Sequence, residues 1–440
     1  MKRLSITILT FLILQNVFAQ QNRNLLTDGY PFRVIKENLI NDYSWVTYPD
    51  YKDRDGWNKL PENIRDAYVK NGEEYLNYKW KYIPASLYLE FTRSGSRAVM
   101  QEPYRANIVA LEGLVMAELM EGKGRFINDI VDGLFYYCEQ TYWGLSAHLS
   151  LQKVGSGLPD AEDPTIDLGV GKVAADLAWI HYFFKEQFEE IHPLINKRLK
   201  SEIYDKVLNP YYERVDLWWM GYTGSMVNNW NPWCNYNVLN CIALLEEDPS
   251  TRAINVQKTM RSVDQFINYY KEDGGCEEGP GYWSHAGGKL FDYLELLNKI
   301  SGGQLSVYDQ PVVQNMGKYI YRAYIDGEYF INFADASAKI HSRPGVIYRY
   351  GKRINDPLMS GFGAYLAKEH HFSEEPITGK IELALENLFS MDEIKTVKPI
   401  APRLKEFNLE KTQIMGARDN TENSNGFYFA AKGGHNAESH

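Results

Sequence analysis

The stretch NIVALEGLVMAELME, residues 107–121, has the spacing of an amphipathic helix and indicates the class of fold. Ile108, Leu111, Val115 and Leu119 recur every three or four residues, so they share one face of a helix. Because a helix with one apolar face must bury that face against another element, the stretch predicts a fold of packed helices.

The same pattern returns along most of the chain. LINKRLKSEIYDKVL, residues 194–208, places Ile195, Leu199, Ile203 and Val207 on one stripe. Further helical stretches are VAADLAWIHYFF (173–184), TMRSVDQFINYY (259–270), KLFDYLELLNKI (289–300) and IELALENLF (381–389). The joints between them are rich in Gly, Pro, Asp and Asn. We therefore expect a mainly α fold over residues 20–395, an α/α toroid in which antiparallel helix pairs form an incomplete barrel. An ordinary helical bundle or solenoid would give similar stripes.

The pattern changes after residue 395. Two prolines in TVKPIAPRLKEF, residues 396–407, end helix propagation, and residues 413–434 have the pattern strand, polar turn, strand. A single hairpin is only marginally stable alone. We therefore expect residues 396–440 to be a linker and the beginning of an antiparallel β-sandwich domain, truncated because the sequence is a fragment.

The first 19 residues have the features of a signal peptide. Lys2 and Arg3 precede the apolar run LSITILTFLIL, and small or apolar residues lead to Ala19. The apolar run is too short to span a bilayer, and no other segment is long and apolar enough. We expect cleavage after Ala19 and a mature protein that is periplasmic or secreted.

The charge and the cysteines narrow the class of protein further. The formal net charge is −10, and removal of the signal peptide with its two cations would leave −12. An acidic chain argues against nucleic acid as a partner, although local donors in a cleft can still bind an acidic polysaccharide. The four cysteines fit no metal-binding spacing and are expected to be buried free thiols: Cys138, Cys234, Cys241 and Cys276.

The joint DGGCEEGPGYWSH, residues 273–285, carries more chemistry than a connector needs. Its glycines permit a sharp turn or a close approach to a ligand, and Glu278 is a candidate cleft acid. If a helix resumes here, Tyr282 and His285 share a face, and a tyrosine beside a histidine can transfer protons without a metal. The alternative interpretation is the start of a helix with buried aromatic side chains.

Two further joints combine aromatic and polar side chains. In MVNNWNPWCNYN, residues 226–237, asparagines surround Trp230 and Trp233; Asn can hold a carboxylate, and Trp offers a flat face to a sugar. In TYWGLSAHLS, residues 141–150, Trp143 lies close to His148. Upstream, Arg105 could bind a carboxylate, although an internal ion pair is the more common role of such an arginine.

These motifs together resemble the heparinase II/III-like polysaccharide lyases. The matching stretches are EGKGRFINDIVDGLFYYCEQTYWGLSAH (121–148), NNWNPWCNYNVL (228–239), DGGCEEGPGYW (273–283) and AAKGGHNAESH (430–440). The resemblance covers roughly residues 100–440. It implies an exported enzyme with an α/α toroid and a β-sandwich-like domain that cleaves a uronic-acid-containing glycan by β-elimination.

The resemblance also implies roles for single residues. Tyr282 matches the family's catalytic tyrosine, Asn229 the asparagine that neutralises the uronate carboxylate, and His440 the histidine from the β-domain; His148 is a further catalytic candidate. Trp230 stands where some relatives have a histidine. The expected substrate contacts are Asn231, Trp230, Trp143, Trp283, Glu278 and Arg105. No cofactor is expected for the chemistry, and any structural metal would belong to the missing part of the β-domain.

Two other functions are compatible with the sequence. A glycoside hydrolase on the same toroid would use a carboxylate pair, such as Glu102 or Asp273 with Glu278. A non-catalytic glycan-binding protein could keep the fold without the activity. The sequence does not indicate the glycan, the direction of attack or the oligomeric state.

Overall fold

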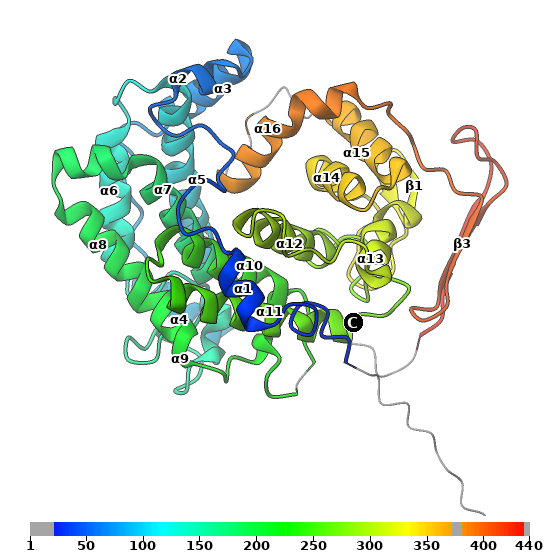
Figure 1. Ribbon diagram of the computed structural model, residues 1–440, viewed down its shortest axis with the longest axis horizontal. Helices are drawn as coiled ribbons and strands as arrows, with labels where there is room; N and C mark the ends of the chain where they lie inside the picture. Colours follow the sequence, from blue (N-terminus) through cyan, green and yellow to red (C-terminus); the bar gives the residue numbers. More distant parts are fainter. Residues whose placement is uncertain (1–21, 225, 372–375, 377–380, 435–440) are drawn as a thin grey trace, which may run out of the picture.

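The computed structural model describes residues 22–224, 226–371, 376 and 381–434, which are mainly α-helical with a small antiparallel sheet (Figure 1). The helices of the first half are α1 (Phe32–Asn38), α2 (Arg54–Asn58), α3 (Glu62–Glu73), α4 (Ala85–Ser94), α5 (Ala98–Glu121), α6 (Ile127–Cys138), α7 (Leu168–Ile191), α8 (Leu194–Ile203) and α9 (Asn209–Glu213). Short 3-10 turns cover Ser146–Leu151 and Trp218–Met220, and a π-helical turn extends α8 over Tyr204–Leu208.

The second half holds the remaining helices and all the strands. Its helices are α10 (Trp230–Leu245), α11 (Pro249–Tyr269), α12 (Gly287–Ile300), α13 (Pro311–Arg322), α14 (Pro344–Arg353), α15 (Pro357–Glu369) and α16 (Ile381–Thr396). Its strands are β1 (Tyr324–Asp326), β2 (Tyr329–Phe330), β3 (Glu406–Leu409), β4 (Ile414–Arg418) and β5 (Tyr428–Lys432).

The apolar stripes predicted from the sequence form the core. Leu111, Val115 and Leu119 are buried in α5, and the four apolar residues of 194–208 are buried in α8 and the turn that extends it. Burial of such a side chain stabilises the fold by about 1.5–3 kcal/mol. The prediction of a mainly helical fold is confirmed.

Helix α10 lies at the centre of the packing. It contacts α7, α11 and α12, and nearly all of its side chains are buried. A helix buried on every side has no solvent face for polar residues. Its asparagines must therefore find hydrogen-bond partners inside the protein.

The C-terminal strands form one sheet in the order β3-β4-β5, antiparallel throughout. The hairpin predicted within residues 413–434 is β4 with β5, in which Ile414 faces Lys432. Strand β3 and the small β1–β2 hairpin were not predicted. Both are short, and β1 and β2 lie in a stretch without a clear alternation of apolar and polar residues.

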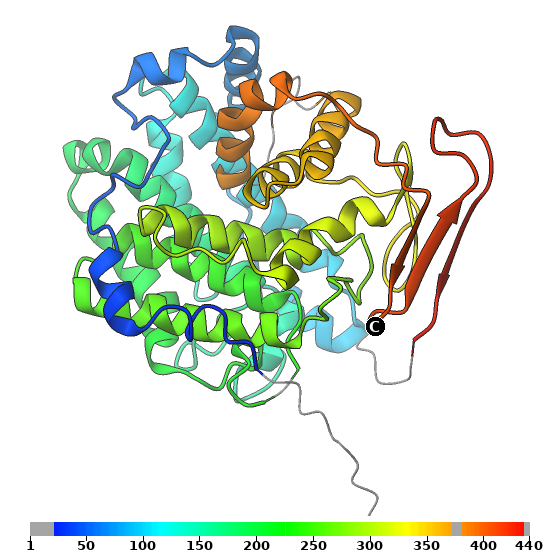
Figure 2. The ribbon, with the colours of Figure 1, turned by 45° about the vertical axis from the view of Figure 1, so that its right-hand side comes forward.

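Side-chain hydrogen bonds tie this sheet to the helical part of the protein, beside which it lies in Figure 2. The Asp273 carboxylate accepts from the backbone N–H of Lys411 and of Thr412, both at 2.7 Å, and from the Thr412 hydroxyl at 2.6 Å. Arg403, before β3, donates to Asp326 at 2.6 Å. The segment after α16 is therefore joined to two distant parts of the chain.

Other predictions have mixed outcomes. All four cysteines are buried and free, as predicted. Among the described helices, none is long and apolar enough to cross a membrane. Residues 1–19, the expected signal peptide, and His440 lie outside the described residues, so their roles stay predictions.

Candidate active site

The N-terminal end of α10 gathers several of the predicted site residues. The Asn228 side chain accepts a hydrogen bond from the backbone N–H of Trp230, the first residue of α10, at 3.0 Å. Asn229 lies between them, and its side-chain N–H donates to the Glu278 carboxylate at 2.8 Å. Both Asn229 and Glu278 are buried, at 9% and 7% exposure. This bond connects α10 to the loop that carries Tyr282.

His148 lies against the same end of α10. Its imidazole is 4.5 Å from the Trp230 ring, centroid to centroid, and its Nδ1 is 2.6 Å from an oxygen of Asp167. Asp167 is fully buried and also caps α7 through the N–H of Val170 at 2.7 Å. Because a carboxylate only accepts, Nδ1 carries the proton, and in the neutral form of the ring Nε2 has the free lone pair. Asp167 therefore orients His148 as a proton acceptor. This role of Asp167 was not predicted from the sequence.

Trp230 is half-buried between two rings. Its indole lies 5.3 Å from Trp218 and 4.5 Å from His148, so part of its surface is covered by protein. The uncovered part of the Trp230 indole is the surface on which the predicted contact with substrate would form.

Tyr282 and His285 lie on the loop between α11 and α12. Their rings are 6.0 Å apart, and His285 is 5.0 Å from the ring of Trp233, on α10. Tyr282 is half-buried, and its hydroxyl makes no hydrogen bond to the residues that the structure describes. Its phenol is therefore available for proton transfer.

The backbone conformation of this loop requires glycine at two positions. Gly274 has φ +77°, and a side chain there would meet the backbone of Asn315 at 2.1 Å; Gly279 has φ +88°, and a side chain there would meet the backbone oxygen of Phe333 at 2.3 Å. Only glycine fits both positions without strain.

Three of the expected substrate contacts are structural instead. Trp143 and Trp283 are at most 1% exposed, and their indole N–H groups donate to the backbone oxygens of Tyr137 and Met316. Asn231 is fully buried and donates to the backbone oxygens of Trp219 and Ser262, both at 2.8 Å. All three are buried and hydrogen-bonded inside the protein, so nothing in the structure supports the prediction that they contact substrate.

Arg105 and Glu278 also differ from expectation. Arg105 is exposed on α5 and donates to Gln101 at 2.9 Å, and no described contact joins it to the residues at the end of α10. Glu278 faces Asn229 and orients its amide, which is a positioning role. One of the two amide N–H groups of Asn229 remains for a ligand.

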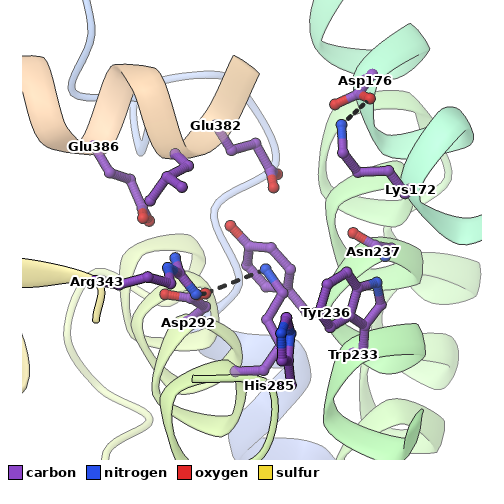
Figure 3. A pocket seen from close by; sticks show the side chains of 12 residues that line it. Lys172, Asp176, Trp233, Tyr236, Asn237, His285, Asp292, Arg343, Glu382 and Glu386 are labelled. Atoms are coloured by element: carbon purple, nitrogen blue, oxygen red, sulfur yellow. Dashed lines mark hydrogen bonds and ion pairs between the residues drawn. The ribbon is translucent and has the colours of Figure 1, made fainter. Parts of the chain in front are cut away.

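A narrow polar pocket adjoins this cluster through His285 and Trp233 (Figure 3). Its volume is about 50 Å³, enough for a few water molecules. Its charged lining side chains come from α7, α12, α16 and the residue before α14: Lys172, Asp176, Lys289, Asp292, Arg343, Glu382 and Glu386. The pocket was not predictable from the sequence, because each of its charged residues looks like part of the solvent-exposed face of a separate helix.

Two carboxyl groups of the pocket titrate differently. Burial raises the pKa of Glu382 to about 7, despite the nearby Lys289. Burial would also raise the pKa of Asp292, but Arg343, Lys289 and Arg349 outweigh it and hold that pKa at about 2. At neutral pH, Asp292 is ionised and Glu382 is partly protonated.

Two donors of the pocket lack partners. The Trp233 indole N–H and the Asn237 amide nitrogen are buried without a hydrogen bond to any described residue. Leaving such a donor unpaired costs about 1–3 kcal/mol. The pocket therefore favours a ligand group that accepts hydrogen bonds, such as a hydroxyl or carboxylate oxygen.

The described residues hold no group of three or more His, Cys, Asp or Glu side chains arranged to bind a metal ion. The sequence matches no protein-family model, and the comparison with curated proteins found no match. The function must therefore be argued from the geometry of this site.

Proposed function

We propose that the protein is an exported polysaccharide lyase that cleaves a uronic-acid-containing glycan by β-elimination. One observation carries the proposal: His148, Asn229 and Trp230 meet at the end of α10, and Asn229 is bonded to the loop that presents Tyr282. His148 is an oriented base, and Asn229 is an uncharged hydrogen-bond donor for a carboxylate. Trp230 offers an aromatic surface, and Tyr282 a phenol. The helical fold supports an α/α toroid, with acidic oligosaccharides or polysaccharides as substrates and a periplasmic or secreted location.

The chemistry follows from the acidity of the uronate C5–H. Its proton is hard to remove until the adjacent carboxylate is neutralised, and the free N–H of Asn229 can donate to that carboxylate as enolate charge develops. Tyr282 and His148 then divide two proton transfers: one group takes the C5 proton, and the other protonates the leaving O4. The C5–H electron pair forms the C4=C5 double bond as the C4–O4 bond breaks. One new chain end therefore carries the C4=C5 double bond, and the other carries the protonated O4 as a hydroxyl group.

The hydrolase alternative has less support. Asp273, one of its expected carboxylates, is occupied by the backbone and hydroxyl of Thr412, and Glu278 by Asn229. Glu382 and Asp292 have the split pKa values of an acid and base pair. The pocket of about 50 Å³ that holds them is too narrow for a sugar ring.

The test follows ultraviolet absorbance of an unsaturated uronate during incubation with a panel of uronate polysaccharides. Tyr282→Phe is expected to lower kcat by about 100-fold or more with unchanged thermal stability, since proton transfer typically contributes about 10²–10⁴-fold. Trp283→Phe, on the neighbouring buried residue, is the matched control and should lower stability instead. Reducing ends without absorbance would indicate a hydrolase, and binding unaffected by Tyr282→Phe without any turnover would indicate a glycan-binding protein.

Asn229→Ala tests the carboxylate donor. Because neutralisation is stronger in the transition state, kcat should fall more than KM rises. Glu278→Gln keeps a hydrogen-bond acceptor for Asn229 and should preserve most of the activity. An effect of Asn229→Ala on KM alone would contradict the role.

A further inference from the structure

A second and larger cavity lies between α12, α14 and α16, against the segment that precedes α2. Its volume is about 460 Å³, within the range of roughly 300–1,000 Å³ typical of ligand sites. It shares Glu386 with the narrow pocket of Figure 3 but contains none of the proposed catalytic residues. We call it the Lys299 cavity.

Three of the four cations in the wall of this cavity are neutralised by its three acids. The pairs are Arg349 with Glu386 at 2.5 Å, Arg353 with Glu295 at 2.6 Å, and Lys352 with Glu393. Each acid of the cavity is thus already paired with a neighbouring cation.

Lys299 is the cation without a counterion. No carboxylate of the described residues lies within 4 Å of its ammonium group, and no described residue accepts a hydrogen bond from it. Burial lowers the pKa of Lys299, while Glu386 raises it and Arg349 lowers it, so the paired neighbours largely cancel. Lys299 is half-buried, and its ammonium group has no counterion to offset the partial loss of its hydration. The cavity therefore has one unsatisfied positive charge.

The cavity also offers surface suited to a sugar ring. The Tyr48 and Phe389 rings lie 5.4 Å apart, Phe389 is 37% exposed, and the Lys299 ammonium is 5.4 Å from the Tyr48 ring centre. Sugar rings pack their C–H faces against aromatic side chains, and hydroxyl and amide groups of Thr47, Ser390 and Asn355 are close by in the wall.

We propose that the Lys299 cavity binds a small acidic sugar, with one singly charged oxyanion at Lys299 and the ring against Tyr48 and Phe389. The oxyanion is a uronate carboxylate or a sugar sulfate ester, both of which supply the missing acceptors. The site is separate from Asn229 and Tyr282, so the proposal stands whether or not the protein is a lyase.

A simpler role for Lys299 is electrostatic. It lies in the last turn of α12, where a cation is stabilised by the helix dipole, typically by about 0.3–1 kcal/mol. That role predicts no ligand, and it predicts that removal of the charge lowers stability. The two roles therefore give opposite results in the same variant.

The test is calorimetric titration of the purified chain at constant ionic strength. The probes are glucuronate, N-acetylglucosamine 6-sulfate, glucose and inorganic sulfate. One of the two acidic sugars should bind with a stoichiometry of one at the Lys299 cavity, and glucose should not bind there. Which acidic sugar binds distinguishes a carboxylate from a sulfate ester.

Lys299→Met should weaken this binding at least tenfold and raise the melting temperature of the ligand-free protein, because it removes a half-buried charge that has no counterion among the described residues. The control Lys352→Met/Glu393→Gln removes one complete pair from the same wall and should leave the affinity within about threefold, since the net charge is unchanged. Asn229→Ala should leave this binding intact, which separates it from binding at the proposed active site.

Three outcomes would overturn the proposal. They are equal affinity of Lys299→Met and the unmodified protein, no binding of either acidic sugar, and a lower melting temperature of Lys299→Met without ligand binding. Inorganic sulfate binding as tightly as both sugars would overturn the role assigned to Tyr48 and Phe389.

Discussion

Asn231 offers a direct test of which asparagines at the end of α10 are structural. Its side-chain N–H groups donate to the backbone oxygens of Trp219 and Ser262, and all three residues are fully buried. No other described donor reaches the Trp219 oxygen, so Asn231→Ala leaves that acceptor unpaired, at a cost of about 1–3 kcal/mol. Loss of the second hydrogen bond adds about 1 kcal/mol. We expect a free energy of unfolding lower by about 3 kcal/mol.

The assay is urea unfolding of both proteins, followed by tryptophan fluorescence and by circular dichroism on the same samples. Agreement of the two probes and an unchanged slope would show that the stability itself has changed. Asn228→Ala is the matched control, because Asn228 is only half-buried and its loss should cost about 1 kcal/mol. A loss below about 1 kcal/mol for Asn231→Ala, together with a raised KM, would refute the structural role.

Two further predictions concern a buried acid and the attachment of the sheet. Glu382 has a pKa of about 7 in the folded protein, above its ordinary value, so its contribution to stability is fully present below about pH 4.5 and is lost as the pH rises to 7. Glu382→Gln should therefore match the unmodified protein at pH 4 and exceed its stability by up to about 3 kcal/mol at pH 8, measured by urea unfolding; equal stability at both values would contradict the raised pKa. Asp273→Ala should remove about 2 kcal/mol of local stability and speed hydrogen exchange of the Lys411 and Thr412 amides roughly 30-fold, measured by mass spectrometry; unchanged exchange would show that other contacts hold the sheet.

The helices were predictable because apolar residues that become buried recur in the sequence at helical spacing. Leu111, Val115 and Leu119 repeat at helical spacing and are buried, although α5 buries every residue from 110 to 120 and not one face alone. The β4–β5 hairpin was predictable for a similar reason, since a polar turn separates two apolar runs. Strand β3 was missed because the four residues Glu406–Leu409 are too few to show alternation.

The site was predictable only in part, because a sequence motif does not show which way each side chain points. Asn229 and Asn231 are two residues apart in one motif, yet Asn229 lies before the helix and faces Glu278, whereas Asn231 lies inside it and faces α11. The same limit applies to Trp283 beside Tyr282: adjacent residues point in different directions, and only packing decides which one is buried.

Charges from distant segments were the least predictable feature. Lys289 and Asp292 are close in sequence, but Arg343 and Glu382 reach the same pocket from other helices or their flanks. Each looks like an ordinary solvated charge until the helices are assembled. Asp167 was missed similarly, because its contact with His148 spans 19 residues.

The attachment of the C-terminal sheet has a consequence for a nicked protein. Asp273 holds the turn between β3 and β4, Asp326 holds Arg403, and Arg418 of β4 donates to the backbone oxygen of Ile325 at 2.9 Å. These hydrogen bonds do not depend on the peptide that links α16 to β3. A break in the backbone between residues 397 and 402 would therefore leave two fragments that stay associated, and separately produced fragments with these ends should reassemble by complementation.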